Sequence, residues 1–315
     1  MLEVKGLTVA YEDSDAVQDA SFTVTQGEWL MLIGPNGAGK STLLAAVAQC
    51  AAYRGSVLLE GCDARQWKPK AFARAVGVLA QTHAAGYAFT VEELVSMGRY
   101  AHTRGFFRSR DPQGQEAVRR ALDAVGLWNL RGRNAQTLSG GELQRAFLAQ
   151  AMAQEPRVLL LDEPANHLDL VYQKQLFELI GQWLAEGERG VISVVHDLSL
   201  ALRYGTRAVL LDHGCVTADG PAGDVLASDA LRRAYGMDVA GWMADLAGRW
   251  RKVADCEAQS IQAGDTRRIN SFQKRASEGC SSRTITIFIS RFSQEAAFLF
   301  SGPYPKIFFW NKLDQ

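Results

Sequence analysis

A glycine-rich stretch near the N-terminus constrains the fold of this chain more than any other feature. Residues 34–41 read Gly-Pro-Asn-Gly-Ala-Gly-Lys-Ser and fit G-x-x-x-x-G-K-[ST] at every position, between the apolar run 29–33 and the helix-forming stretch 41–49. Such glycines let successive backbone N–H groups point at phosphate oxygens, and the following helix adds the positive end of its dipole. The predicted contacts to a nucleotide come from Gly34, Pro35, Asn36, Gly37, Ala38, Gly39, Lys40, Ser41 and Thr42.

Two side chains of this loop carry its chemistry. Lys40 is placed to reach the β- and γ-phosphates, and the Ser41 hydroxyl is placed to bind Mg²⁺. The motif therefore predicts nucleotide binding, but by itself it leaves GTPases, kinases and motors open.

Two adjacent carboxylates, Asp162 and Glu163, follow the apolar run 158–161. The carboxyl ends of parallel strands meet at one edge of a sheet, so we expect both side chains near the phosphate loop. Asp162 is predicted to hold Mg²⁺ through its water shell, because this ion prefers oxygen ligands and keeps several waters. Glu163 is predicted to be the general base for the water that attacks the γ-phosphate. The alternative is that one carboxylate merely ends a strand.

The order of strand-like and helix-like stretches indicates the fold class. Strand patterns dominate the first 60 residues, helical patterns occupy 91–99, 114–126 and 141–154, and strands return at 158–161, 191–195 and 208–211. We therefore expect an α/β P-loop fold with a mainly parallel sheet. An N-terminal antiparallel β-subdomain and an α-helical subdomain inserted at about 85–155 complete the prediction.

The end of the chain has a different composition. Only three isoleucines precede residue 251, whereas six follow it, and no periodic pattern continues the preceding domain. The domain prediction is thus one ATPase domain over 1–245 and an atypical C-terminal tail over 246–315, disordered or derived from a frameshift. A small accessory domain is the alternative.

A third motif decides between the classes of nucleotide-binding protein. Residues 138–142, Leu-Ser-Gly-Gly-Glu, resemble the LSGGQ signature of ABC ATPases at four of five positions, with Glu142 in place of glutamine. The resemblance covers about residues 1–240 and implies ATP and Mg²⁺ as cofactors. It also implies that Ser139, Gly140, Gly141 and Glu142 contact phosphate. In this family two subunits pair head to tail, and each signature closes on the ATP held by the other, which predicts a homodimer.

Other positions match the family pattern residue by residue. Tyr11 resembles the aromatic residue that stacks on adenine, with an ordinary surface tyrosine as the alternative. Gln81 resembles the glutamine that senses Mg²⁺ and the attacking water, so it counts as both a catalytic residue and a metal ligand. Asp169 ends a stretch similar to the loop that crosses to the partner subunit. His196 resembles the histidine that contacts the γ-phosphate.

Charge and hydropathy restrict the partners. The chain carries 34 basic and 34 acidic side chains, which argues against nucleic acid as a partner. Its apolar runs are too short to cross a bilayer, the N-terminus has no export signal, and five cysteines without metal-type spacing suit the cytoplasm. The resemblance then implies a peripheral subunit at the cytoplasmic face of the inner membrane, bound to permease subunits and indirectly to a substrate-binding protein.

Within the family, the stretches 90–99 and 166–173 resemble importer subunits for iron(III)-siderophores, haem or vitamin B12. An importer ATPase for another substrate, such as zinc or manganese, is an alternative. A nucleotide-switch ATPase without a transport role is another.

Overall fold

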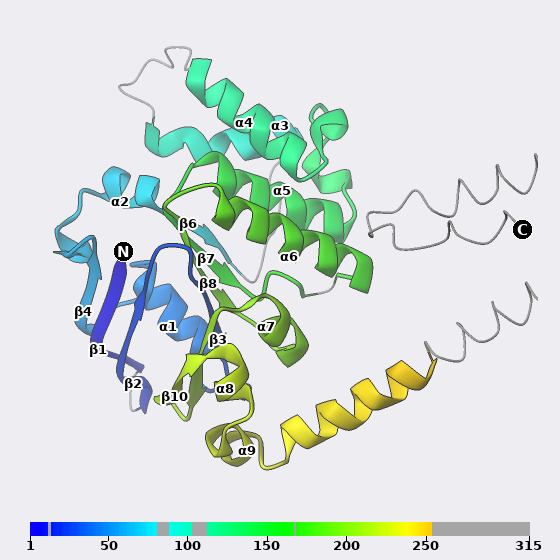
Figure 1. Ribbon diagram of the computed structural model, residues 1–315. Coiled ribbons are helices and arrows are strands. Elements are labelled where there is room, and N and C mark those ends of the chain that lie inside the picture. The colour runs from blue at the N-terminus through cyan, green and yellow to red at the C-terminus, as the bar shows by residue number, and fades with distance from the viewer. Residues whose placement is uncertain (12–13, 81–87, 103–111, 167, 254–315) are drawn as a thin grey trace, which may run out of the picture. The chain divides into compact units, whose positions relative to one another are not determined.

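The computed structural model describes every residue except 12–13, 81–87, 103–111, 167 and 254–315 (Figure 1). The chain divides into two compact units, Met1–Trp242 and Met243–Gln315. The predicted domain boundary between residues 245 and 246 falls within a helix at 239–253. Most of the predicted tail lies outside the described residues, and its assignment stays a prediction.

The first sheet is antiparallel, with its strands in the order β2-β1-β4-β5. These strands are β1 (Leu2–Tyr11), β2 (Ser14–Val24), β4 (Arg54–Leu59) and β5 (Cys62–Asp63). Alternate residues such as Val57 and Leu59 are buried, the period-two pattern of a strand with one face on the core. This sheet is the predicted N-terminal β-subdomain.

The second sheet has the order β10-β9-β3-β8-β7-β6 and is parallel except at the β9–β10 edge. Its strands β3 and β8 are buried at every position, which explains their continuous apolar runs. The mainly parallel sheet is thereby confirmed. The strands are β3 (Trp29–Ile33), β6 (Val76–Leu79), β7 (Val158–Asp162), β8 (Gly190–Val194), β9 (Arg207–Asp212) and β10 (Cys215–Pro221).

Helices pack on this sheet through a few large side chains. The rings of Trp29 on β3 and Phe177 on α6 stack with centroids 5.3 Å apart, and the Trp29 indole donates to the Ser193 hydroxyl at 2.8 Å. Up to residue 235, the described helices outside the insert are α1 (Lys40–Val47), α2 (Pro69–Ala75), α6 (Leu170–Ala185), α7 (Leu198–Tyr204), α8 (Ala222–Leu226) and α9 (Asp229–Tyr235), with a 3₁₀ turn at Ala64–Gln66.

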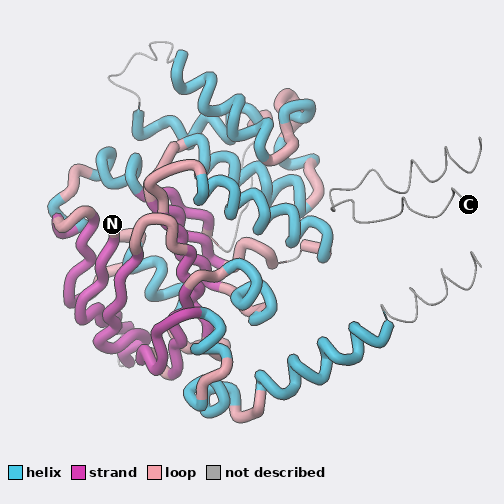
Figure 2. The backbone as a smooth tube through the Cα atoms, viewed as in Figure 1, coloured by secondary structure: helices cyan, strands magenta, loops and turns pink. Residues whose placement is uncertain are grey.

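The predicted helical insert lies between β6 and β7. It contains α3 (Val91–Ser96), α4 (Pro112–Ala124) and α5 (Gly140–Ala153), with 3₁₀ turns at Met97–His102, Trp128–Leu130 and Ala135–Thr137. Helices α3 and α4 both pack on α5. Figure 2 shows the helices of the insert grouped together, beside the strands of the core. Among the described residues, no helix has the length and apolar character needed to span a membrane.

Candidate functional site

The glycine-rich loop joins the end of β3 to the start of α1. Gly34 and Gly39 have φ values of +144° and +96°, a region that L side chains rarely adopt. A Cβ at Gly34 would lie 2.0 Å from the Leu211 carbonyl oxygen, and one at Gly39 would lie 2.3 Å from that of Ala16. Glycine is therefore required at both positions for the backbone to pass this close to its neighbours.

Lys40 begins α1 and is almost fully buried, at 5% exposure. Its ammonium group donates to the carbonyl oxygens of Gly34 and Pro35, each at 2.8 Å. Burial lowers the pKa of Lys40, while the nearby carboxylates of Glu163 and Asp162 act in the opposite direction. A buried cation thus lies at the centre of the loop, where anionic phosphate groups would compensate it.

Ser41 and Asp162 are direct neighbours, although they come from different elements. The Ser41 hydroxyl on α1 donates to Asp162 Oδ1 at the end of β7, at 2.9 Å. Burial raises the pKa of Asp162, and Glu163 adds to the rise, whereas the Ser41 hydrogen bond, His196 and Lys40 oppose it. A hydroxyl and a partly buried carboxylate form an oxygen-only donor set, which fits a hard divalent cation.

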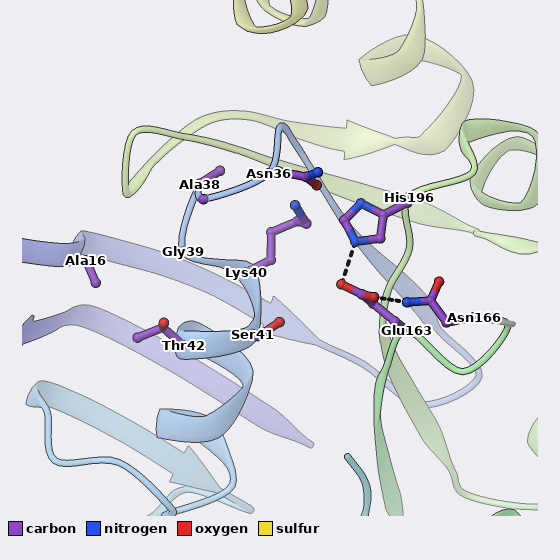
Figure 3. A pocket seen from close by; sticks show the side chains of 11 residues that line it. Ala16, Asn36, Ala38, Gly39, Lys40, Ser41, Thr42, Glu163, Asn166 and His196 are labelled. Atoms are coloured by element: carbon purple, nitrogen blue, oxygen red, sulfur yellow. Dashed lines mark hydrogen bonds and ion pairs between the residues drawn. The ribbon is translucent and has the colours of Figure 1, made fainter. Parts of the chain in front are cut away.

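Glu163 lies one residue beyond β7 in a left-handed conformation, with φ at +51°. Its carboxylate accepts a hydrogen bond from the Asn166 side-chain amide and contacts the His196 imidazole Nε2 (Figure 3). The carboxylate is 8% exposed, whereas His196 is 38% exposed. A non-glycine residue with positive φ at a strand end holds its side chain in a direction that an extended backbone would not give.

Lys40, Ser41, Glu163 and His196 line one pocket of about 640 Å³, and Asp162 adjoins it through its hydrogen bond from Ser41. Figure 3 shows Lys40 and Ser41 at the start of α1, with Glu163 and His196 facing them from two other segments of the chain. The structure thus brings together most residues predicted for the phosphate site. The lining residues are Ala16, Asn36, Gly37, Ala38, Gly39, Lys40, Ser41, Thr42, Glu163, Asn166 and His196.

The predicted signature residues lie outside this pocket. Ser139 is the N-cap of α5, and Glu142 completes a capping box with it. Glu142 Oε2 accepts from the Ser139 backbone N–H at 2.8 Å and from its hydroxyl at 2.9 Å, and these hydrogen bonds lower the pKa of Glu142. Ser139 and Gly140 are exposed, so the segment is accessible to another chain.

The remaining predicted residues differ in how far the structure describes them. Asp169 is the N-cap of α6, and its carboxylate accepts from the Tyr172 backbone N–H at 3.0 Å. Gln81 and the side chain of Tyr11 lie outside the described residues.

Sequence reasoning missed the contribution of Ala16 to the pocket and the contact of Asn166 with Glu163. It also missed Tyr235 at the end of α9. Burial raises the pKa of Tyr235, and a backbone hydrogen bond from Gly34 opposes that rise. Only the spacing of Asn166, three residues after Glu163, offered a signal in the sequence.

The parallel sheet and the glycine-rich loop define a P-loop nucleotide-binding protein. Residues 17–166 match the family model described as ABC transporter. The chain is 42% identical over 220 residues to the hemin import ATP-binding protein HmuV of Nocardia farcinica, covering 70% of this chain and 75% of that protein. It is 36% identical over 232 residues to the ferric enterobactin transport ATP-binding protein FepC of Escherichia coli, covering 73% of this chain and 85% of that protein. This chain belongs to the family of ABC transporter ATP-binding proteins.

Other relatives differ in length or share mainly the fold. The chain is 38% identical to the ABC transporter ATP-binding protein YvrA of Bacillus subtilis over 239 residues, which are 76% of this chain but span only 54% of that protein. A solved ATP-binding subunit of an ABC transporter superposes with a TM-score of 0.62 at 27% identity, covering 76% of this chain and 94% of that one. A bacterial ABC transporter cassette solved as a dimer superposes with a TM-score of 0.63 at 23% identity, covering 70% of this chain and 99% of that one. This likeness shows the fold alone.

Proposed function

We propose that this chain is the ATP-binding and ATP-hydrolysing subunit of an importer for an iron(III)-siderophore, haem or a cobalamin-type compound. The observation that carries the hydrolytic part is the convergence of the loop 34–42, Asp162 and Glu163 at one site. The substrate class is supported by the hemin and ferric enterobactin import proteins among the relatives. The subunit works at the cytoplasmic face of the inner membrane on permease subunits, and a substrate-binding protein acts through that permease.

The loop holds the phosphates of ATP. The Lys40 ammonium, which donates to two carbonyl oxygens of its own loop, is close enough to exchange them for phosphate oxygens. Ser41 and Asp162 would hold Mg²⁺, with Gln81 as a further ligand by resemblance; the ion supplies charge neutralisation at the phosphates. Tyr11 stacks on adenine in the same proposal.

Glu163 is the general base in this proposal. Its carboxylate takes a proton from the water that attacks the γ-phosphate, and the left-handed backbone directs it into the pocket. His196 touches this carboxylate and lines the same pocket, which supports a role in positioning the attacked phosphate. Gln81 shares this role by resemblance alone.

One chain supplies only part of the site. Ser139–Glu142 lie outside the pocket formed by their own phosphate loop, and Ser139 and Gly140 face solvent. A head-to-tail homodimer brings this segment of each subunit, with Asp169 beside it, to the ATP of the other.

A transport assay in sealed vesicles tests the whole proposal. The chain is co-purified with its permease, and ATP-dependent uptake is measured for ferric siderophores, haem and cobalamin, with zinc and manganese as the alternative substrates. Uptake of one iron(III) chelate, haem or cobalamin that is abolished by Glu163→Gln supports the proposal. ATP binding without turnover in the presence of the permease would instead favour a nucleotide-switch protein.

A further inference from the structure

Two glutamine side chains hold the loop that follows Glu163. The Gln144 side-chain amide donates to the Pro164 carbonyl oxygen at 3.2 Å. The amide of Gln173 on α6 donates to the carbonyl oxygens of Ala165 at 3.3 Å and Leu168 at 3.1 Å. Both glutamines are half-buried, so water competes weakly for these hydrogen bonds. The backbone after the proposed general base is thus fixed from two helices.

Gln144 belongs to α5, the helix that Ser139 begins. Gln144 and Arg145 follow Gly141 by three and four residues, so each lies next to Gly141 on the surface of this helix. A Cβ at Gly141 would lie 3.4 Å from Leu168 Cδ2, and the Arg145 guanidinium lies 5.2 Å from the centroid of the Tyr172 ring. This face of α5 therefore packs on the loop after Glu163 and on the first turn of α6.

The same loop is bonded to Glu163 itself. The Asn166 backbone N–H donates to the Glu163 carbonyl oxygen at 3.1 Å, and its side-chain amide contacts the Glu163 carboxylate. A continuous set of contacts therefore runs from the Glu163 carboxylate, through the loop and Gln144, to the first turn of α5.

We propose that Gln144 is a positioning residue that couples the two ATP sites of the dimer. This inference rests on the head-to-tail dimer proposed above, in which the first turn of α5 contacts the ATP of the other subunit. A change in the contacts of Glu163 at one site shifts the segment from Pro164 to Asn166, and the hydrogen bond from Gln144 passes that shift to Ser139–Gly141. Coupling of this kind is a free energy shared between the two sites, and it shows as cooperative ATP hydrolysis.

The test uses Gln144→Leu in the full chain, with Gln175→Leu on the exposed side of α6 as the matched control. Hydrogen–deuterium exchange of the backbone amides of Ala165, Asn166 and Leu168 is expected to rise about fivefold in Gln144→Leu, the scale of losing one hydrogen bond, and to stay unchanged in the control. The Hill coefficient for ATP hydrolysis is expected to fall toward about 1, while the rate at saturating ATP changes by less than about threefold.

A second variant, Gln144→Asn, keeps an amide but is one methylene too short to reach Pro164, and the same results are expected for it. Unchanged exchange at Ala165, Asn166 and Leu168 would show that the hydrogen bond from Gln144 does not hold this loop. Faster exchange with an unchanged Hill coefficient would contradict the role of Gln144 in coupling the two ATP sites. A wild-type chain that hydrolyses ATP without cooperativity would contradict it as well. A wild-type chain with no ATP hydrolysis contradicts the proposed function instead, and the exchange measurement then still decides whether Gln144 holds the loop.

Discussion

The Ser41 hydroxyl donates a hydrogen bond to Asp162 Oδ1 at 2.9 Å, although 121 positions separate the two residues in the chain. Two of the proposed Mg²⁺ ligands are thus already side by side, one on α1 and one at the end of β7. Burial disfavours the ionised form of Asp162, so its carboxylate is poorly compensated by the protein alone. The position is suited to a cation and costs stability without one.

Asp162→Asn is expected to raise the thermal stability of the nucleotide-free chain at neutral pH. Because burial raises the pKa of Asp162 in the folded chain, its contribution to stability is fully present below the unfolded value, about 4, and is lost as pH rises through the folded value. The gain from the variant should therefore grow from about pH 4 toward neutrality. Thermal unfolding across this range measures it, and Mg²⁺ with ATP should stabilise the wild type more than the variant. A variant that is less stable at pH 7 would contradict this account.

Glu163→Gln is expected to lower steady-state ATP hydrolysis by about two orders of magnitude or more, the scale of losing a positioned base. ATP binding should persist, because the amide keeps the shape of the side chain and Lys40 is unchanged. Phosphate release and equilibrium ATP binding are measured together, with the exposed Glu178→Gln on α6 as the control. Unimpaired turnover in Glu163→Gln would rule out Glu163 as the base.

Glu142→Gln is expected to strengthen ATP-driven dimerisation by about threefold to tenfold at low salt, with a smaller effect at high salt. Hydrogen bonds from the Ser139 backbone and hydroxyl lower the pKa of Glu142, so its carboxylate stays charged at neutral pH. In the proposed dimer that charge lies near the phosphates bound by the partner. Sedimentation in the Glu163→Gln background measures the ATP dependence of dimerisation.

The matched control for that experiment is Glu93→Gln on α3. Thr90 and Glu93 form the same capping box, with hydrogen bonds of 2.8 and 2.9 Å to the glutamate, at a helix start that does not line the phosphate pocket. Both variants exchange the carboxylate of a capping box for an amide, whose oxygen can still accept from the N-cap residue. Equal ATP dependence in the two variants would show that only the cap, and not the charge near phosphate, is involved.

The sequence predicted those parts of the fold that local patterns determine. The strands β3, β7 and β8 are buried apolar runs, and the loop at Gly34–Ser41 requires glycine at fixed positions, so both are readable from neighbouring residues. The edge strand β10 was not predicted, because its residues Cys215–Pro221 are at most partly buried and include Asp, Gly and Pro.

Some residues that line the candidate site were predictable from the sequence, whereas the contacts between them were not. Lys40, Ser41, Asp162 and Glu163 were identified because motifs fix their chemistry at short spacing. The donation from Gln144 to Pro164 spans 20 residues and depends on how α5 packs on the loop, for which a glutamine in a helix gives no local signal. The same holds for the contact of Tyr235 with Gly34, which depends on the placement of α9.

The left-handed backbone at Glu163 bears on how this position would change if selection on activity were relaxed. Glutamate is an unfavourable residue at a φ of +51°, whereas asparagine and glycine adopt this conformation at lower cost. A variant carrying asparagine or glycine at 163 would gain backbone stability while it lost the proposed base. The backbone strain at position 163 and the proposed catalytic role of its side chain therefore act in opposite directions, and a substitution there would exchange one for the other.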